Sequence, residues 1–143
     1  MAEANLQETL LTYTLRANYL QTEISNLQSQ KSLLLYSQAD IQDIKGQEEQ
    51  AIREMYRAMY SDDPSIKEKY VDYTEIPDFE EAMDKIAAKY EEEMAQLTAD
   101  ETHIDDQITT NDTELAEINA YKESIKQMLQ SNIQEDYNYG LNS

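Results

Sequence analysis

Two series of residues at seven-residue steps constrain the fold of this chain more than any other feature. They are Leu6, Tyr13, Leu20, Leu27, Leu34, Ile41, Glu48 and Met55, and then Met83, Tyr90, Leu97, Ile104, Asn111, Ile118, Ile125 and Asn132. A mostly apolar series at this step marks the face of a long helix that packs along its length against another helix. The sequence therefore predicts an all-α fold, an elongated antiparallel hairpin or coiled coil of long helices at about 2–60 and about 78–138.

Turn-forming residues are scarce, which excludes folds with many short strands. The 143 residues include two Gly and two Pro, and neither Cys nor Trp. Sandwiches and barrels need frequent turns, whereas the abundant Gln, Glu, Leu and Ala mostly favour helices. Without cysteine the chain has no disulfide, no thiolate metal site and no thiol nucleophile. We expect a single hairpin domain over 1–143, because the length fits one domain.

Each series has a companion four residues further on; that of the second series includes Ile108 and Leu115. The companion of the first series changes character along the helix. It is apolar at Leu10, Ala17 and Ile24, polar at Lys31, Gln38 and Lys45, and apolar again at Ile52 and Met59. The positions three residues after Ile41, Glu48 and Met55 are apolar, namely Ile44, Ala51 and Ala58. The sequence therefore predicts that the contact face drifts across the helix in its second half.

The two series also predict a register. If the helices fold back on each other, the numbers of facing residues sum to about 138. This register places Met55 near Met83, Leu34 near Ile104, and Leu6 near Asn132.

Two glycines bear on where the helices end. Gly46 could be the residue that ends one helix, or an interior glycine in a continuous or gently kinked helix. The unbroken seven-residue step through Ile41 and Met55 favours the continuous helix, with a kink or break at Gly46 as the alternative. Gly140 is predicted to cap the second helix before a short C-terminal end.

A connector at about 61–77 joins the predicted helices. Asp63 followed by Pro64 predicts an N-cap with proline in the first helical position, opening a short helix to about Tyr70. Residues 71–76 are expected to be extended, since the residue before Pro77 avoids the α region. Asp78, three residues before Glu81, fits a capping box for the second long helix.

The chain is strongly acidic, with a net charge of −19. Residues 1–60 hold 5 basic and 8 acidic side chains (−3), and residues 61–143 hold 6 and 22 (−16). Such charge argues against nucleic acid as a partner, and it either keeps the protein soluble or attracts a basic protein segment. No signal peptide or membrane-spanning segment is recognised, so we expect no membrane insertion and a cytoplasmic protein, with leaderless export as the alternative.

Two surfaces are candidates for partner contacts. The first gathers apolar residues outside the predicted contact face, which a two-helix hairpin leaves uncovered: Leu11, Leu15, Tyr19, Leu33, Leu35, Tyr36, Tyr137 and Tyr139. It predicts a homo-oligomer or a helical protein partner, unless a bent-back segment covers it within the chain. The second is an acidic aromatic tip of Tyr60, Asp62, Asp63, Tyr70, Asp72, Tyr73, Glu75 and Phe79. Its rings either dock a basic segment or close the end of the hairpin core.

Catalytic and metal-binding patterns are weak. His103, the single histidine, follows Asp100 by three residues, but di-iron bundles need two such pairs and two further glutamates. We expect no enzyme activity and no cofactor. The main hypothesis is a structural or adaptor protein that acts through self-association and protein contacts. The predicted outline resembles export-apparatus stalk proteins and leaderless secreted helical hairpins, so a secretion-associated chaperone, stalk component or substrate is the alternative, ahead of a metal-binding bundle.

Overall fold

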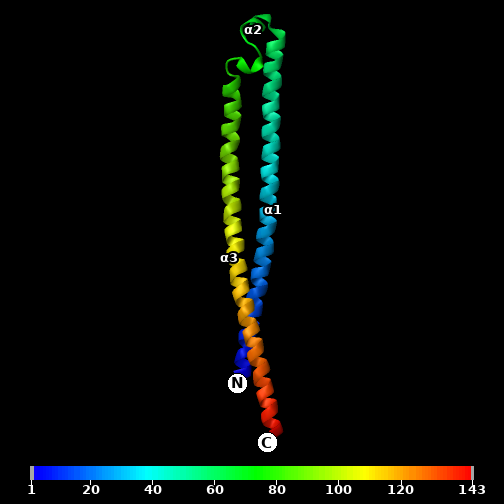
Figure 1. The fold of residues 1–143 in the computed structure, drawn as a ribbon, viewed down its shortest axis with the longest axis vertical. Helices are drawn as coiled ribbons and strands as arrows, with labels where there is room; N and C mark the ends of the chain where they lie inside the picture. The colour runs from blue at the N-terminus through cyan, green and yellow to red at the C-terminus, as the bar shows by residue number, and fades with distance from the viewer. Residues whose placement is uncertain (1, 143) are drawn as a thin grey trace. The chain divides into compact units, whose positions relative to one another are not determined.

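The computed structural model describes the backbone of residues 2–142 and the side chains of residues 3–136. Its elements are α1 (Ala2–Asp62), α2 (Pro64–Lys69), a 3-10 helix η1 (Tyr73–Glu75) and α3 (Phe79–Asn142). No β-strand occurs among the described residues. The predicted all-α, hairpin-like fold is confirmed (Figure 1).

The chain divides into two compact units. Unit 1 combines the part of α1 up to Lys31 with the part of α3 from His103 onward, and unit 2 comprises residues 32–102. In each unit a segment of α1 packs against a segment of α3, and unit 2 also contains α2 and η1. We describe each unit separately.

Unit 1 contains an apolar core. Ala17, Leu20 and Ile118 form a buried cluster, with Tyr13 and Leu115 packed against it. Leu20 is 1% exposed. Further buried residues in this unit are Ile24, Leu27, Ile104 and Ile125. All of these α1 and α3 residues belong to the predicted seven-residue series or to their companions, because that spacing keeps successive side chains on one face.

Unit 2 is packed differently, because polar side chains occupy its helix contact. Gln38 donates a hydrogen bond to Glu101 across the two helices at 3.1 Å. Further along, the Tyr90 hydroxyl donates to the Glu48 carboxylate at 2.6 Å. The buried residues of unit 2 are Tyr56, Ile76, Ile86 and Tyr90. Unit 2 therefore combines a polar contact with a small aromatic and aliphatic core.

The predicted drift of the contact face in α1 is wrong over most of the helix. Lys31, Gln38 and Lys45 are half-buried, whereas Ile44 and Ala51 are exposed. Hydrogen bonds and ion pairs hold the polar residues in place, since Lys31 contacts Asp105 of unit 1 at 2.8 Å and Lys45 contacts Glu49 at 3.8 Å. A long polar side chain can bury its stem and keep its charged end in contact with a partner.

A shift does occur near the end of α1. Met55 and Met59 continue the predicted series but are 50% and 41% exposed. Tyr56 is buried and Tyr60 is half-buried in their place. Large rings bury more apolar area than methionine, so the contact face turns by one residue here.

Cross-helix contacts agree with the predicted antiparallel register within each unit. In unit 1, Lys31 contacts Asp105, and the two residue numbers sum to 136. In unit 2, Gln38 contacts Glu101, which gives 139.

The connector confirms some local predictions and corrects others. Asp63 is the N-cap of α2 and accepts a hydrogen bond from the Ser65 amide at 3.0 Å. The expected extended stretch instead contains η1, capped by Asp72, which accepts from the Thr74 amide at 2.7 Å. Asp78 has a φ of 75° rather than the extended backbone of an N-cap residue. Asp tolerates this left-handed conformation better than most residues.

Both glycines lie inside helices. α1 continues through Gly46, and a Cβ placed there would meet no atom within 4 Å. α3 continues through Gly140 to Asn142, so the short irregular end predicted after about 138 is wrong. Among the described residues, no helix combines the length and apolar character needed to cross a membrane.

Candidate functional site

The first candidate surface lies on α1 within unit 1, and we call Leu11, Leu15 and Tyr19 the Leu11 stripe. These residues are spaced at four-residue steps, so they share one face of the helix. Their exposed fractions are 54–61%, while Ala17 and Leu20 between and beside them are buried. The Arg16 guanidinium lies 5.1 Å from the centre of the Tyr19 ring. Leu11 and Leu15 therefore face away from the α3 contact, whereas Tyr19 lies at its edge and lines a hollow between α1 and α3.

Arg16 is fixed beside this stripe by an ion pair. Its Nε and Nη2 atoms donate to the Glu114 carboxylate of α3 at 3.0 and 3.2 Å. The two side chains are 46% and 38% exposed, so solvent screens the pair and it contributes little to stability. Its geometry holds the guanidinium where it covers part of Tyr19 and leaves the two leucines open.

Further along α1, in unit 2, Leu33, Leu35 and Tyr36 form what we call the Leu33 patch. They are 45–71% exposed, and Leu34 between them is half-buried in the helix contact. Leu33 and Tyr36 are three residues apart and share a helical face, while Leu35 lies nearer the contact. The patch and the stripe contain all described members of the predicted apolar surface. Tyr137 and Tyr139 lie outside the residues whose side chains are described.

In the predicted tip, the aromatic rings pack on one another. Phe79 makes edge-to-face contacts with Tyr56 and Tyr73, with ring centres 5.3 and 5.4 Å apart. The Tyr60 hydroxyl donates hydrogen bonds to the carbonyl oxygens of Tyr70 (3.2 Å) and Val71 (2.7 Å). Edge-to-face pairs stabilise beyond the area they bury. The geometry favours rings that close the end of the hairpin.

The acidic residues of the tip mostly organise the connector. Hydrogen bonds from the Ser65 hydroxyl and amide lower the pKa of Asp63. Hydrogen bonds from the Thr74 hydroxyl and amide lower the pKa of Asp72 in the same way. Glu75 accepts a hydrogen bond from the Val71 amide at 3.0 Å. Asp62, at the last position of α1, is exposed.

Sequence reasoning missed an apolar groove in unit 2, which we call the methionine groove. Its volume is about 570 Å³, and its lining is Met55, Ala58, Met59, Asp62, Asp63 and Ile66. The seven-residue step assigned both methionines to the helix contact. The one available signal was the competing series of Ile52, Tyr56 and Tyr60 at four-residue steps, which places larger apolar side chains on the contact face.

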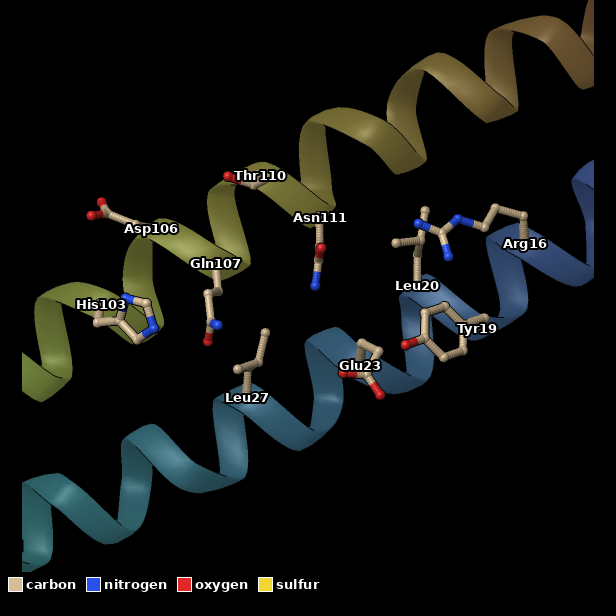
Figure 2. A pocket seen from close by; sticks show the side chains of 10 residues that line it. All are labelled: Arg16, Tyr19, Leu20, Glu23, Leu27, His103, Asp106, Gln107, Thr110 and Asn111. Carbon is tan, nitrogen blue, oxygen red and sulfur yellow. The ribbon is translucent and has the colours of Figure 1, made fainter.

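A second hollow lies between α1 and α3 in unit 1, with a volume of about 390 Å³. Figure 2 shows Asn111 and Gln107 of α3 extending toward α1, where Leu20 and Leu27 lie on the facing side. His103 also lines it, and Asp100, its predicted companion, instead accepts a hydrogen bond from Gln96 at 3.0 Å. The lining combines Arg16 with acidic, amide and apolar groups, so its charge favours no ligand class.

The polar contact of unit 2 contains three ionisable groups whose pKa values are shifted by their hydrogen bonds, Glu48, Lys89 and Tyr90. The hydrogen bond from the Tyr90 hydroxyl lowers the pKa of Glu48, and the same bond raises the pKa of Tyr90. Lys89 reaches Glu48 at 3.3 Å and lies 4.9 Å from the centre of the Tyr90 ring. Its pKa is raised by hydrogen bonding to Tyr90 and Glu48. These three side chains form one hydrogen-bonded and ion-paired network across the helix contact.

Over the described residues, no three or more His, Asp or Glu side chains are arranged to hold a metal ion. No family model, curated protein or solved structure matches this chain. The candidate surfaces therefore rest on the geometry of this chain itself.

Proposed function

We propose that this protein is a non-enzymatic structural or adaptor coiled-coil protein that self-associates through the outer face of α1. The observation that supports this proposal most directly is the exposure of large apolar side chains in the Leu11 stripe and the Leu33 patch. Scattered exposed leucines are ordinary on a protein surface, but grouped ones mark interaction sites.

The spacing of the Leu11 stripe supports a helical partner surface. Residues at four-residue steps on one helix form a ridge that fits the groove of a second helix. Burying one exposed leucine contributes roughly 1.5–3 kcal/mol. In a twofold dimer every buried residue contributes twice, so a short ridge on each copy is enough to offset part of the cost of association.

The net charge of −19 opposes self-association, and this gives the proposal a distinctive salt dependence. Added salt screens the repulsion between two acidic copies, while apolar contact is not weakened by screening. Association should therefore strengthen as salt rises. An association built on ion pairs would weaken instead.

Light scattering during size-exclusion chromatography tests this proposal over a range of protein and salt concentrations. We expect a mass above the 16.6 kDa of one chain, rising with both concentrations. The variants Leu15→Gln and Leu33→Gln should each weaken association by roughly tenfold. Circular dichroism should show unchanged helicity, because both side chains are exposed.

Ile133→Gln is the matched control, since Ile133 is 57% exposed but belongs to α3. It should leave association unchanged. A chain that stays monomeric at every concentration, or an equal loss in the Ile133 variant, would contradict the assignment to α1. Loss of helicity in the leucine variants would place those residues in an intramolecular contact.

A further inference from the structure

We propose that the methionine groove docks a cationic amphipathic helix of a protein partner. This inference goes beyond self-association and is independent of it, because it concerns a different part of α1. It rests on the shape of the groove, on the exposure of its floor and on the sign of its charge.

The floor of the groove has the spacing of a helix-binding surface. Met55, Ala58, Met59 and Asp62 follow at steps of three, one and three residues, so they lie along one face of α1. Ile66 of α2 lines the same groove. The small Ala58 side chain between the two methionines leaves room for side chains of a ligand. Amphipathic helices bind by placing an apolar face in such a groove.

The two methionines are available for contact. They are 50% and 41% exposed, although apolar residues in this part of α1 otherwise turn toward α3 or the connector, as Tyr56 does. Methionine is unbranched and polarisable, so it adapts to partner side chains of different shapes. A volume of about 570 Å³ accommodates several apolar side chains of a bound helix.

The negative charge around the groove favours a basic partner helix. Asp62 and Asp63 line it, and both charged members of the lining are therefore acidic. Hydrogen bonds from Ser65 lower the pKa of Asp63, so its carboxylate remains charged at neutral pH. Unit 2 as a whole holds 7 basic and 19 acidic side chains, a balance of −12. Such a surface speeds the approach of a basic partner and repels acidic ones.

Two basic residues close in sequence to the groove lining, Arg57 and Lys69, lie against aromatic rings instead. The Arg57 guanidinium lies 5.1 Å from the centre of the Tyr73 ring, and the Lys69 amine lies 5.6 Å from that of Tyr70. Both contact aromatic rings of the connector. A second copy of this chain is the less favourable occupant, because its own charge of −19 would approach an acidic rim.

The probe for this proposal is a fluorescein-labelled peptide of about 18 residues. Its Leu residues are spaced at three- and four-residue steps so that they share one helical face, and Lys occupies the opposite face. Fluorescence anisotropy measures its binding to the full chain. We expect saturable binding that the double variant Met55→Gln/Met59→Gln weakens by roughly tenfold or more. Ala58→Gln, which fills the floor while keeping both methionines, should weaken binding by a similar factor. This second variant tests the groove even if the double variant does not fold.

Met128→Gln is the matched control, because Met128 is 52% exposed in unit 1, away from the groove. It should bind the probe like the wild type. Two further peptides separate shape from charge: one with the same composition in scrambled order, and one with Glu in place of Lys. Both should bind at least roughly tenfold more weakly.

The proposal is overturned if the groove variants bind the probe as well as the wild type does. Equal binding of the scrambled peptide would reduce the interaction to unspecific charge attraction and would also overturn it. Self-association that is lost in the groove variants but kept in Leu15→Gln would assign the groove to a second copy. These results are distinguishable from failure of the proposed self-association, which is read from mass rather than from peptide binding.

Discussion

Units 1 and 2 are both formed by one segment of α1 and one of α3, yet they bury different kinds of side chain. In unit 1, Ala17, Leu20 and Ile118 meet in an apolar cluster. In unit 2, Gln38 and Glu48 contact Glu101 and Tyr90 through hydrogen bonds. Apolar packing supplies most of the free energy of folding, whereas polar contacts specify which residues face each other. The apolar cluster therefore contributes more to stability in unit 1, and the polar contacts contribute more to the register in unit 2.

The largest effect is expected from Leu20→Ala. Leu20 is 1% exposed, and removing a fully buried leucine side chain costs about 2–5 kcal/mol. The half-buried Leu34 of unit 2 should cost about 1–2 kcal/mol when changed to Ala, because less area is lost. Urea unfolding monitored by circular dichroism measures both. Equal costs would show that the two helix contacts are packed alike. Leu33→Ala is the control, because Leu33 is exposed and its change should cost little unfolding free energy.

Phe79→Ala tests the aromatic end of unit 2. The ring contacts Tyr56 and Tyr73, so its removal should lower the free energy of unfolding by about 2 kcal/mol. Near-ultraviolet circular dichroism should lose the tyrosine signal of this cluster. Tyr121→Ala, which removes the ring stacked on Tyr13 in unit 1, is a comparison of similar size. A cost below that of Tyr121→Ala would mean that the rings do not support unit 2.

Gly46→Ala should stabilise the protein by about 0.5–1 kcal/mol. Gly46 is helical, and an added Cβ meets no atom within 4 Å. Alanine loses less backbone freedom on folding than glycine does. Thermal unfolding measures the gain as a higher Tm. A lower Tm would show that unit 2 needs a flexible or kinked helix at this position.

The smallest effect concerns the pH dependence of unit 2. The pKa of Glu48 is lowered by the Tyr90 hydroxyl, so this contribution is present above the ordinary glutamate pKa of about 4.3 and is lost as the pH falls through the lower folded value. The pKa of Tyr90 is raised, so its contribution is lost only as the pH rises through that raised value, above about 10.

Tyr90→Phe should therefore lower Tm by a few degrees at neutral pH and by less at acidic pH, where Glu48 is protonated. Tyr36→Phe is the control, since Tyr36 is exposed in the same unit. Differential scanning calorimetry from neutral pH to pH about 3 covers the relevant window. A Tm difference between Tyr90→Phe and the wild type that does not change with pH would exclude the hydrogen bond as its cause.

Unit 1 was predictable in more detail than unit 2. Its buried residues follow the seven-residue series because apolar side chains dominate both helices there. In unit 2 this series contains Glu48 and its companion contains Gln38 and Lys45, so sequence reasoning moved the contact to Ile44 and Ala51. That inference failed because it counted apolar character alone. Each of these polar side chains finds a hydrogen bond or ion pair in the fold.

The candidate surfaces show the same division. The exposure of the Leu11 stripe and the Leu33 patch follows from their positions off the seven-residue series. The methionine groove could not be found in this way, because Met55 belongs to that series and Met59 to its companion. Their exposure depends on Tyr56 and Tyr60, which contact Phe79 and the connector carbonyls. These contacts join residues that are not neighbours in the sequence, so the four-residue spacing of Tyr56 and Tyr60 was the one local sign of them.

By itself, the sequence determined that this chain forms two long helices joined by a capped connector, and that an apolar face runs along each helix. These features follow from local spacing and from few turn-forming residues. Only the tertiary structure decided that polar residues remain in the contact of unit 2, that the tip rings pack together, and that two methionines lie exposed beside Asp62 and Asp63. The reason is physical: burial of a side chain depends on its partners across the contact as well as on its own hydrophobicity.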